Sequence, residues 1–335
     1  MKSKNSLLFA ALGLAAAVLF VADLATGSVA LPVGEVWGAL TGGDVPAHTA
    51  LIVREIRLLK AIVALAAGAA LAVSGLQMQT LFRNPLAGPY VLGISSGASL
   101  GVALFLLGAP LLGAAGSSLV STLGLAGAAW TGAAAILLLI AAVGRRVKDI
   151  LVILILGMMF SSGVGAVVQL LQYFSHEDAL KTFVVWTMGS LGEVTSAQAV
   201  LLLPAVAAGL AVAVATIKPL NLLLLGEAYA RTMGLDVRRT RQRVFLSTTL
   251  LAGTVTAFCG PIGFIGLAVP HVVRMLFRTA DHRILLPGSA LAGAVVLLLC
   301  DLIAKTLAIP INTVTALLGI PVVVLVVVRN QSVTQ

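Results

Sequence analysis

The sequence predicts an all-α integral membrane protein, and its composition and its pattern of apolar residues both indicate that class. Of the 335 residues, 60% are hydrophobic and 10% are charged, and the mean hydropathy of +1.11 is too apolar for a water-soluble domain. Apolar runs of about 20 residues, enough to cross a bilayer as a helix, recur along the chain. Since a backbone in hydrocarbon must satisfy its own hydrogen bonds, and alternating strand patterns are absent, we expect these runs to be helices.

Ten apolar runs divide the chain, which we interpret as one transmembrane domain over residues 1–335. They lie near residues 6–28, 59–82, 91–109, 117–143, 150–173, 198–217, 244–260, 267–277, 285–308 and 313–328. The first run follows a basic start, as in a signal peptide, but no polar mature domain follows it, which favours a retained span. The run at 267–277 is too short to cross alone, so we expect a half-helix or a segment buried among its neighbours.

The distribution of charge predicts the orientation, because Lys and Arg accumulate in short cytoplasmic loops. With both termini inside, 16 of the 21 basic residues are cytoplasmic: Lys2, Lys4, Arg83, Arg145, Arg146, Lys148, Lys218, Arg231, Arg238, Arg239, Arg241, Arg243, Arg274, Arg278, Arg283 and Arg329. Eight of the 12 acidic residues fall outside: Asp23, Glu35, Asp44, Glu55, Glu177, Asp178, Glu193 and Asp301. The net charge of +9 therefore indicates membrane orientation and does not argue for nucleic acid.

Five basic residues depart from this rule and fall on the outer side: Arg54, Arg57, Lys60, Lys181 and Lys305. Arg57 and Lys60 are three residues apart at the start of the second span, so on a helix they share one face. Basic residues at span ends often extend to the lipid headgroups. The alternative is a basic outer surface that captures an acidic partner, such as a soluble delivery protein.

A first break in the helical pattern lies between Ser74 and Gly97, where an apolar helix ends in a turn rich in Pro, Gly and Asn. Asn84 precedes Pro85, which disfavours helix at that residue. The segment is either an ordinary cytoplasmic loop or a turn that lines the translocation path. The small residues of 66–75 and 92–102 favour close approach of helices on either side.

The longest cytoplasmic segment, 218–243, mixes apolar and charged residues at helical spacing and predicts an interfacial helix. One apolar face is predicted for Leu222, Leu225, Tyr229 and Met233. Glu227 and Arg231 form an i,i+4 pair on another face, and Gly226 and Gly234 bracket a short helix. Such a helix lies either on the membrane or in a groove of a partner protein.

A second break, over 259–274, has three glycines and two prolines in apolar surroundings and predicts irregular backbone. His271 is expected to be a structural hydrogen-bonding residue, because no partner at metal-ligand spacing accompanies it. Cys259 and Cys300 lie in or at the ends of apolar runs without C-x-x-C spacing, so we expect buried small hydrophobes and neither a disulfide nor a metal site.

The chain lacks the motifs that would give it an energy source or a hydrolytic site of its own. There is no G-x-x-x-x-G-K-[ST] phosphate loop, no G-x-S-x-G and no H-E-x-x-H. An ion-gradient-driven secondary transporter is the competing class, but only Asp23 and Asp301, near span ends, could serve an intramembrane relay. A sensor or scaffold with a docking helix is a further alternative, although it would not need two breaks in its spans. We therefore expect no enzymatic activity and no cofactor in this chain.

Eight ordered motifs carry a resemblance to a known family. They are I-R-L-x-K at 56–60, G-A-A-L-A-x-S-G at 68–75, R-N-P-L-A-x-P at 83–89, L-G-I-S-S-G-A at 92–98, W-T-M-G-S at 186–190, L-G-E-A-Y-A-R-T-M-G-L at 225–235, G-x-I-G-F-I-G-L-x-x-P-H at 260–271 and D-H-R-x-L-L-P-G at 281–288. On these motifs the chain resembles the FecCD-type permeases of type II ABC importers, which carry iron-siderophore complexes, haem or vitamin B12.

The resemblance implies ten helices in each subunit of a homodimer in the bacterial inner membrane. Two ABC ATPase subunits, which bind ATP and Mg, would lie below it and a substrate-binding protein above. Residues 225–235 match the cytoplasmic coupling helix pair of the family, which contacts the ATPase. The coupling residues implied are Gly226, Glu227, Ala230, Arg231 and Gly234.

The resemblance also implies two further sets of functional residues. Arg57, Lys60 and Lys305 match positions that receive carboxylates of the binding protein; lysine at two of them keeps the charge but loses the bidentate geometry of arginine. Asn84 and Leu86 belong to the turn that helps close the path, and Ile150 with Leu151 implies a more apolar gate than the Ser/Thr-bearing version of the vitamin B12 permease. An iron chelate or haem is the expected cargo, with vitamin B12 as the alternative.

Overall fold

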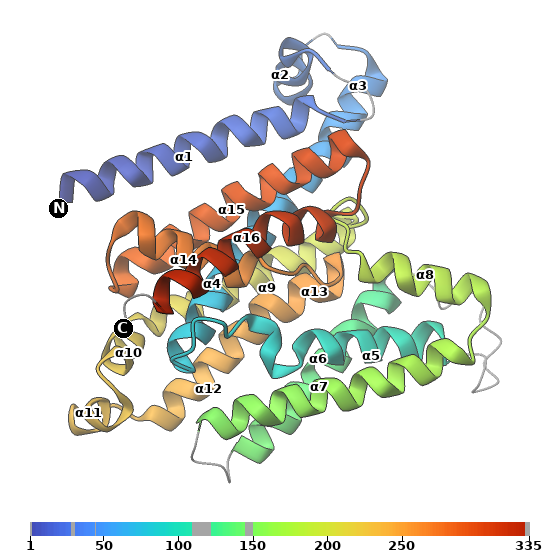
Figure 1. Cartoon of the computed structure of the whole chain (residues 1–335). Helices are drawn as coiled ribbons and strands as arrows, with labels where there is room; N and C mark the ends of the chain where they lie inside the picture. The colour runs from blue at the N-terminus through green and yellow to red at the C-terminus, as the bar shows by residue number, and fades with distance from the viewer. Residues whose placement is uncertain (1, 28–30, 44, 109–121, 145–149, 332–335) are drawn as a thin grey trace.

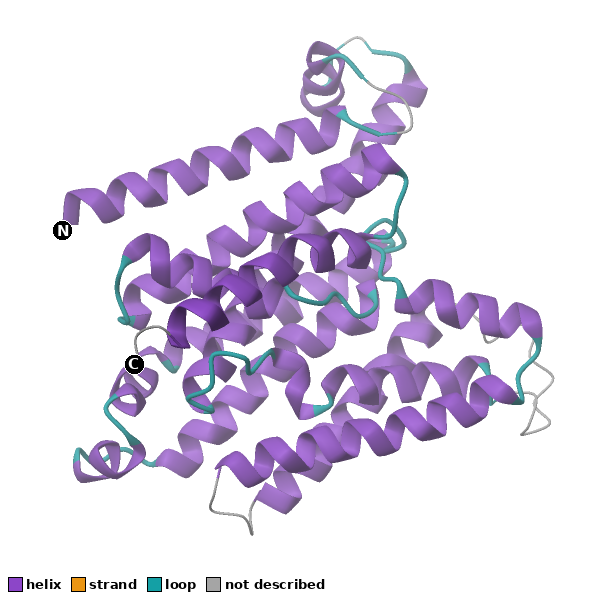
Figure 2. Ribbon diagram, in the orientation of Figure 1, coloured by secondary structure: helices purple, strands orange, loops and turns teal. Residues whose placement is uncertain are grey.

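The computed structural model describes residues 2–27, 31–43, 45–108, 122–144 and 150–331, and the regular structure in these ranges is helical (Figure 2). The elements are α1 (Lys2–Ala25), α2 (Val33–Thr41), α3 (Ala47–Leu51), the π-helical turn η1 (Ile52–Arg57), α4 (Leu58–Leu81), the 3₁₀ turn η2 (Pro89–Leu92), α5 (Ile94–Leu106), α6 (Thr122–Gly144), α7 (Ile150–Tyr173), α8 (Glu177–Thr187), α9 (Ser196–Ala215), α10 (Ile217–Leu224), α11 (Glu227–Thr232), α12 (Val237–Thr248), the π-helical turn η3 (Thr249–Gly253), α13 (Thr254–Cys259), α14 (Ile265–Phe277), α15 (His282–Leu307) and α16 (Ile311–Gln331). The predicted all-α class is confirmed.

Each of the ten predicted apolar runs coincides, in its described part, with a helix. Five helical stretches are long and apolar enough to cross a bilayer: Lys4–Ala25, Ala47–Leu81, Leu151–Tyr173, Ser196–Ala215 and His282–Leu307. Four shorter apolar helices accompany them in the described residues: Ile94–Leu106, Gly124–Ile140, Ile265–Phe277 and Ile311–Val326. The one remaining run, 244–260, lies on the continuous helical stretch α12–η3–α13. This stretch begins earlier than predicted, at Val237. The chain is thus a multi-pass membrane protein, and the total of ten spans stays a prediction.

Helix α4 lies at the centre of the larger hydrophobic core and packs against α9, α12, α14 and α15. Glycines allow the closest of these contacts. A Cβ built on Gly68 would lie 2.3 Å from the Gly293 carbonyl oxygen of α15, and one built on Gly75 would lie 1.7 Å from the Gly266 carbonyl oxygen of α14. The close approach predicted from the small residues of 66–75 is therefore confirmed, since no larger side chain fits at these two positions.

A second core cluster joins α5, α6 and α7 to the C-terminal end of α4. Different helices lie toward the two ends of the molecule (Figure 1). The beginning of α1, the end of α16, α10 and α11 lie toward one end, whereas α2, α3 and α8 lie toward the other. The sequence patterns did not predict α2, α3 or α8, because these short helices lie between the apolar runs.

The half-helix predicted at 267–277 is present as α14, whose 13 residues span only about 20 Å. Two side chains hold the irregular segment before it, 260–264, and a backbone hydrogen bond holds the residue that precedes this segment. The Tyr90 hydroxyl donates to the Ile262 carbonyl at 2.8 Å, and the Asn312 amide oxygen accepts from the Gly263 N–H at 2.9 Å. The Ser190 N–H donates to the Cys259 carbonyl at 2.8 Å. The predicted second break is therefore held in place by hydrogen bonds to distant parts of the chain.

Candidate coupling, gating and docking sites

The coupling segment predicted at 218–243 is three elements, α10, α11 and the first turns of α12. Gly226 has φ 107° and ψ 151°, a backbone conformation open only to glycine, so α10 ends there and α11 starts in a new direction. Gly234, with φ 80°, ends α11. The two glycines bracket a short helix as predicted, but the single continuous apolar face predicted from Leu222 to Met233 is wrong, because the chain turns at Gly226.

Large apolar side chains on α11 and directly beside it are exposed. Leu225, Tyr229 and Met233 are between 51% and 63% exposed, whereas Ala230 is completely buried against the rest of the chain. An exposed Leu, Tyr and Met within one short segment form a surface suited to a partner protein.

Glu227 is the charged centre of this segment. Its carboxylate accepts from Arg231 at 2.7 Å, which confirms the predicted i,i+4 pair. Arg241 of α12 also donates to both oxygens of Glu227, at 3.0 Å each, and is only 13% exposed. The sequence did not predict Arg241 as part of the site, because the pairing depends on how α12 folds back along α11. Nη2 of Arg241, which donates to both carboxylate oxygens, ties the two helices together.

The predicted gate turn comes directly after α4, whose last residue is Leu81. The Asn84 side-chain oxygen accepts from the Leu86 N–H at 2.9 Å, and Leu86 is 45% exposed. His271 Nε2 lies 2.7 Å from the Pro85 carbonyl oxygen, so the hydrogen-bonding role predicted for His271 is confirmed. A Cβ built on Gly226 would lie 4.0 Å from Arg83 Nη1. The gate turn and the coupling segment therefore lie next to one another.

The second predicted gate segment begins α7. Leu151 is half exposed, while the side chain of Ile150 and the preceding residues 145–149 lie outside the described part. Helix α7 contacts α5 and η2, and η2 follows the gate turn in sequence. The two predicted gate segments therefore belong to neighbouring elements.

The three predicted docking residues, Arg57, Lys60 and Lys305, lie near the first turn of α4 and the last turn of α15, on the side predicted to be outer. Lys305 Nζ lies 2.6 Å from Asp23 Oδ1 and 2.9 Å from Asp301 Oδ2, and Lys60 Nζ lies 3.1 Å from Asp301 Oδ1. Asp23 and Asp301 are buried, at 0% and 2% exposure. We call these five residues the outer charge cluster, in which internal carboxylates already pair the two lysines.

Arg57 connects the same cluster to α1. Its guanidinium donates to the Leu24 and Ala25 carbonyl oxygens at 2.8 and 2.9 Å, where the helix leaves carbonyls without helical partners. Lys60 is the most open of the three cations, with 21% of its side chain exposed against 11% for Lys305. The sequence placed Asp23 and Asp301 on the outer side but did not predict that they pair with the lysines.

Potential metal-ligating side chains are not clustered in the described residues. Within them, no group of three or more His, Cys, Asp and Glu side chains lies close enough to hold a metal ion. Cys259 and Cys300 are both buried and free, as predicted for small hydrophobes.

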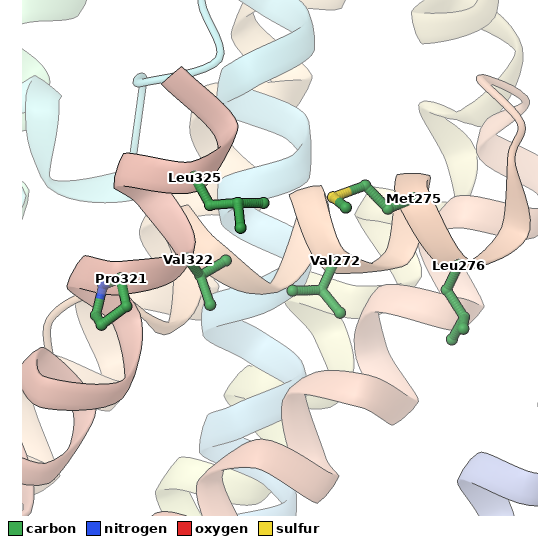
Figure 3. A pocket seen from close by; sticks show the side chains of 6 residues that line it. All are labelled: Val272, Met275, Leu276, Pro321, Val322 and Leu325. Carbon is green, nitrogen blue, oxygen red and sulfur yellow. The ribbon is translucent and has the colours of Figure 1, made fainter. Parts of the chain in front are cut away.

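A groove of about 490 Å³ between α14 and α16 is lined by apolar side chains (Figure 3). Val272, Met275 and Leu276 come from α14, and Pro321, Val322 and Leu325 from α16. This groove provides an apolar surface for lipid or protein and no charged group for a polar ligand.

Comparison with known proteins places these elements in a family. The sequence model of the FecCD transport family matches residues 15–329. The hemin transport system permease protein HmuU of Yersinia pestis is 39% identical over 326 residues, covering 94% of this chain and 93% of that protein. The vitamin B12 import system permease protein BtuC of Salmonella typhi is 38% identical over 306 residues, covering 90% and 91%.

A solved structure agrees with the sequence comparisons. It is described as a metal-chelate type ABC transporter in an inward-facing conformation, with a TM-score of 0.84 at 30% identity over 97% of this chain and 99% of that one. Because both the family match and the relatives extend over nearly the whole length, the chain belongs to the FecCD transport family.

Proposed function

We propose that this chain is the permease subunit of an ATP-binding-cassette importer that moves an iron chelate, a siderophore complex or haem, from a substrate-binding protein across the bacterial inner membrane. The observation that carries the proposal is α11, a short exposed helix set between two glycines and held by the Glu227 charge cluster. Such a helix is suited to receive force from a separate ATPase. ATP and Mg would be bound by that partner, and this chain would need no cofactor.

The cytoplasmic partner would contact Gly226, Glu227, Arg231 and Gly234 of the coupling segment. Ala230, the fifth residue predicted for this contact, is completely buried and would instead hold α11 against the rest of the chain. Exposed Tyr229 and Met233 supply the apolar part of that contact, and Arg231 supplies charge at its edge. Substituting Glu227 and Arg231 together should reduce the amount of ATPase that co-purifies with the permease. An undiminished complex would count against this assignment.

On the outer side, we propose that the outer charge cluster receives carboxylates of the binding protein. Its three cations face two carboxylates, which leaves a surplus of one positive charge. Lys60 is the most exposed cation and offers the most direct contact. We expect Lys60→Glu to weaken capture of the binding protein in a pull-down without loss of basal ATP hydrolysis. Lys218→Glu, at an exposed lysine on the predicted cytoplasmic side, is the matched control, and equal capture by both variants would refute the docking role.

A homodimer with two ATPase subunits and cytoplasmic termini completes the proposed assembly. Between its copies, the path would be closed by the turn that bears Asn84 and Leu86 and by the start of α7 at Ile150 and Leu151. The exposed apolar side chains of Leu86 and Leu151 suit a gate that excludes water when two copies meet. Cross-linking of single cysteines at these positions should give dimers whose yield changes with bound ATP.

Uptake by proteoliposomes tests the function itself. The permease is reconstituted with its ATPase and binding protein. It should import cargo only when ATP is present on the side of the membrane where the ATPase is bound. Uptake that persists without the ATPase and collapses with an ionophore would instead indicate a secondary transporter. Competition among a ferric siderophore, haem and vitamin B12 identifies the cargo, and selective uptake of vitamin B12 would overturn the iron-chelate assignment.

A further inference from the structure

Helix α10 occupies the position between the coupling helix and the inner end of α4. It packs against α11, α15 and α4, and Figure 1 shows it beside α11 at the end of the molecule. Leu220 and Leu223 bury its apolar face. Apolar contacts are not directional and do not by themselves fix the position of α10 along its neighbours. Polar contacts that fix this position therefore affect how α11 acts on the rest of the chain.

Asn221 of α10 is bonded to the start of α15 at three points. Its Oδ1 accepts from the His282 backbone N–H at 2.9 Å and lies 2.7 Å from His282 Nδ1, and its Nδ2 donates to Asp281 Oδ1 at 2.6 Å. The pKa of Asp281 is held below its usual value, chiefly by the hydrogen bond from the Arg283 backbone N–H, so this carboxylate stays an acceptor. The Asn221 amide orientation is thereby fixed, and Nδ1 of His282 must carry a proton.

His282 passes this connection on to α4. Its Nε2 lies 2.9 Å from Thr80 Oγ1, and both residues are buried, His282 completely. With the proton on Nδ1, the neutral imidazole offers Nε2 as an acceptor for the Thr80 hydroxyl. That hydroxyl also lies 2.9 Å from the Leu76 carbonyl oxygen and has one proton to donate. Thr80 can therefore bind His282 or its own helix, which makes two discrete arrangements.

A second polar contact fixes the start of α10 to the same face of α4. Gln77 Nε2 donates to Thr216 Oγ1 at 3.0 Å, and Gln77 Oε1 accepts from the Ser247 hydroxyl of α12 at 3.0 Å. Gln77 and Thr80 are three residues apart and so share one face of α4. All of these side chains are buried, where hydrogen bonds are strong and a lost partner is costly.

We propose that Thr80, Asn221 and His282 are positioning residues that transmit movement of α11, through α10, to the gate turn. The inference rests on the proposed function, in which the ATPase acts on 225–235. Thr80 lies four residues before Asn84, so a shift of α10 displaces the last turn of α4 and with it the turn that carries Asn84 and Leu86. Gln77 forms the second contact between α10 and α4. Because two contacts connect the helices, a displacement of α10 moves α4 and does not simply turn it about one hydrogen bond.

The test uses the complete transporter of permease, ATPase and binding protein in proteoliposomes and measures cargo imported per ATP hydrolysed. Thr80→Val removes the hydroxyl without changing shape, and Asn221→Leu removes the amide. We expect import per ATP to fall about tenfold in each, the loss that one or two buried hydrogen bonds would produce. The ATPase should stay bound, and Thr80→Ser, which keeps the hydroxyl, should restore coupling.

Thr315→Val is the matched control, because Thr315 is equally buried and donates to the Asn312 carbonyl of its own helix. A merely structural role for Thr80 would lower the thermal unfolding midpoint of Thr80→Val and leave import per ATP as in the unsubstituted chain. That result, or loss of ATPase binding by Thr80→Val, would overturn the proposal. If Asn221→Leu does not fold, the isosteric Thr80→Val decides alone. An ATPase that fails to bind the unsubstituted chain would contradict the proposed function instead, so the two failures are distinguishable.

Discussion

Replacing Lys305 by methionine is the sharpest test of the outer charge cluster. The substitution keeps an unbranched side chain one atom shorter and removes an ammonium that lies 2.6 Å from Asp23 and 2.9 Å from Asp301. Both carboxylates are almost completely buried, so one of them would lose its compensating charge in an environment that water cannot reach. Breaking a buried ion pair by removing one partner costs about 3–5 kcal/mol.

The expected loss can be converted to a change in melting temperature. For 335 residues, an unfolding entropy of about 2.1 cal/mol/K per residue gives about 0.7 kcal/mol/K, so the apparent midpoint should fall by about 4–7 °C. The assay is thermal unfolding of the detergent-purified permease. Lys181→Met, on exposed α8, is the matched control and should change the midpoint by less than about 1 °C.

A double substitution separates the ion pair from the loss of side-chain packing. Lys305→Met with Asp23→Leu removes both charges of the closest pair and leaves Lys60 to balance Asp301. The double variant should recover most of the lost stability, because an apolar pair of similar volume avoids the buried unpaired charge. Two results would refute the reasoning. One is a Lys305→Met protein with the same unfolding midpoint as the unsubstituted chain, and the other is a double variant that is no more stable than Lys305→Met alone.

Three further substitutions test other parts of the structure. Arg241→Ala removes one of the two cations that hold Glu227, and we expect ATPase affinity to fall about twofold to fivefold, as for a solvent-screened ion pair, measured by titration of the purified complex. Gly226→Ala forces a side chain into a glycine-only backbone conformation and should cost about 1–3 kcal/mol in thermal unfolding; an unchanged midpoint would contradict the strained turn. Gly75→Ala places a Cβ against the backbone of α14 and should cost about 3 kcal/mol, whereas Gly163→Ala, with open space around it, should leave the midpoint unchanged.

Hydropathy and backbone chemistry were sufficient to predict much of the fold. Apolar runs located the helices because lipid demands long, internally bonded segments, and Asn84-Pro85 and the glycines of 260–266 marked the breaks because they restrict or free the backbone locally. The short helices α2, α3 and α8 escaped prediction, since they lie between the apolar runs and have no span-length pattern.

The contacts in the candidate sites also divide into those that the sequence predicts and those that it does not. The pair of Glu227 and Arg231 follows from local helical spacing and could be read from the sequence. The partnership of Arg241 with Glu227 and the bond between Thr80 and His282 depend on how distant segments fold together, the latter across 202 positions. Such pairings leave no periodic signal in a single sequence.

The contact between Asp23 and Lys305 also bears on how the protein is made. The two residues lie 282 positions apart, and a ribosome adding about 5–20 residues per second would need roughly 15–60 s to travel between them. During that interval α1 is already synthesised, but the Asp23 carboxylate has not met its ammonium partner and is more stable near the hydrated membrane surface. The end of α1 that carries Asp23 can therefore reach its final contacts only after α15 has been synthesised.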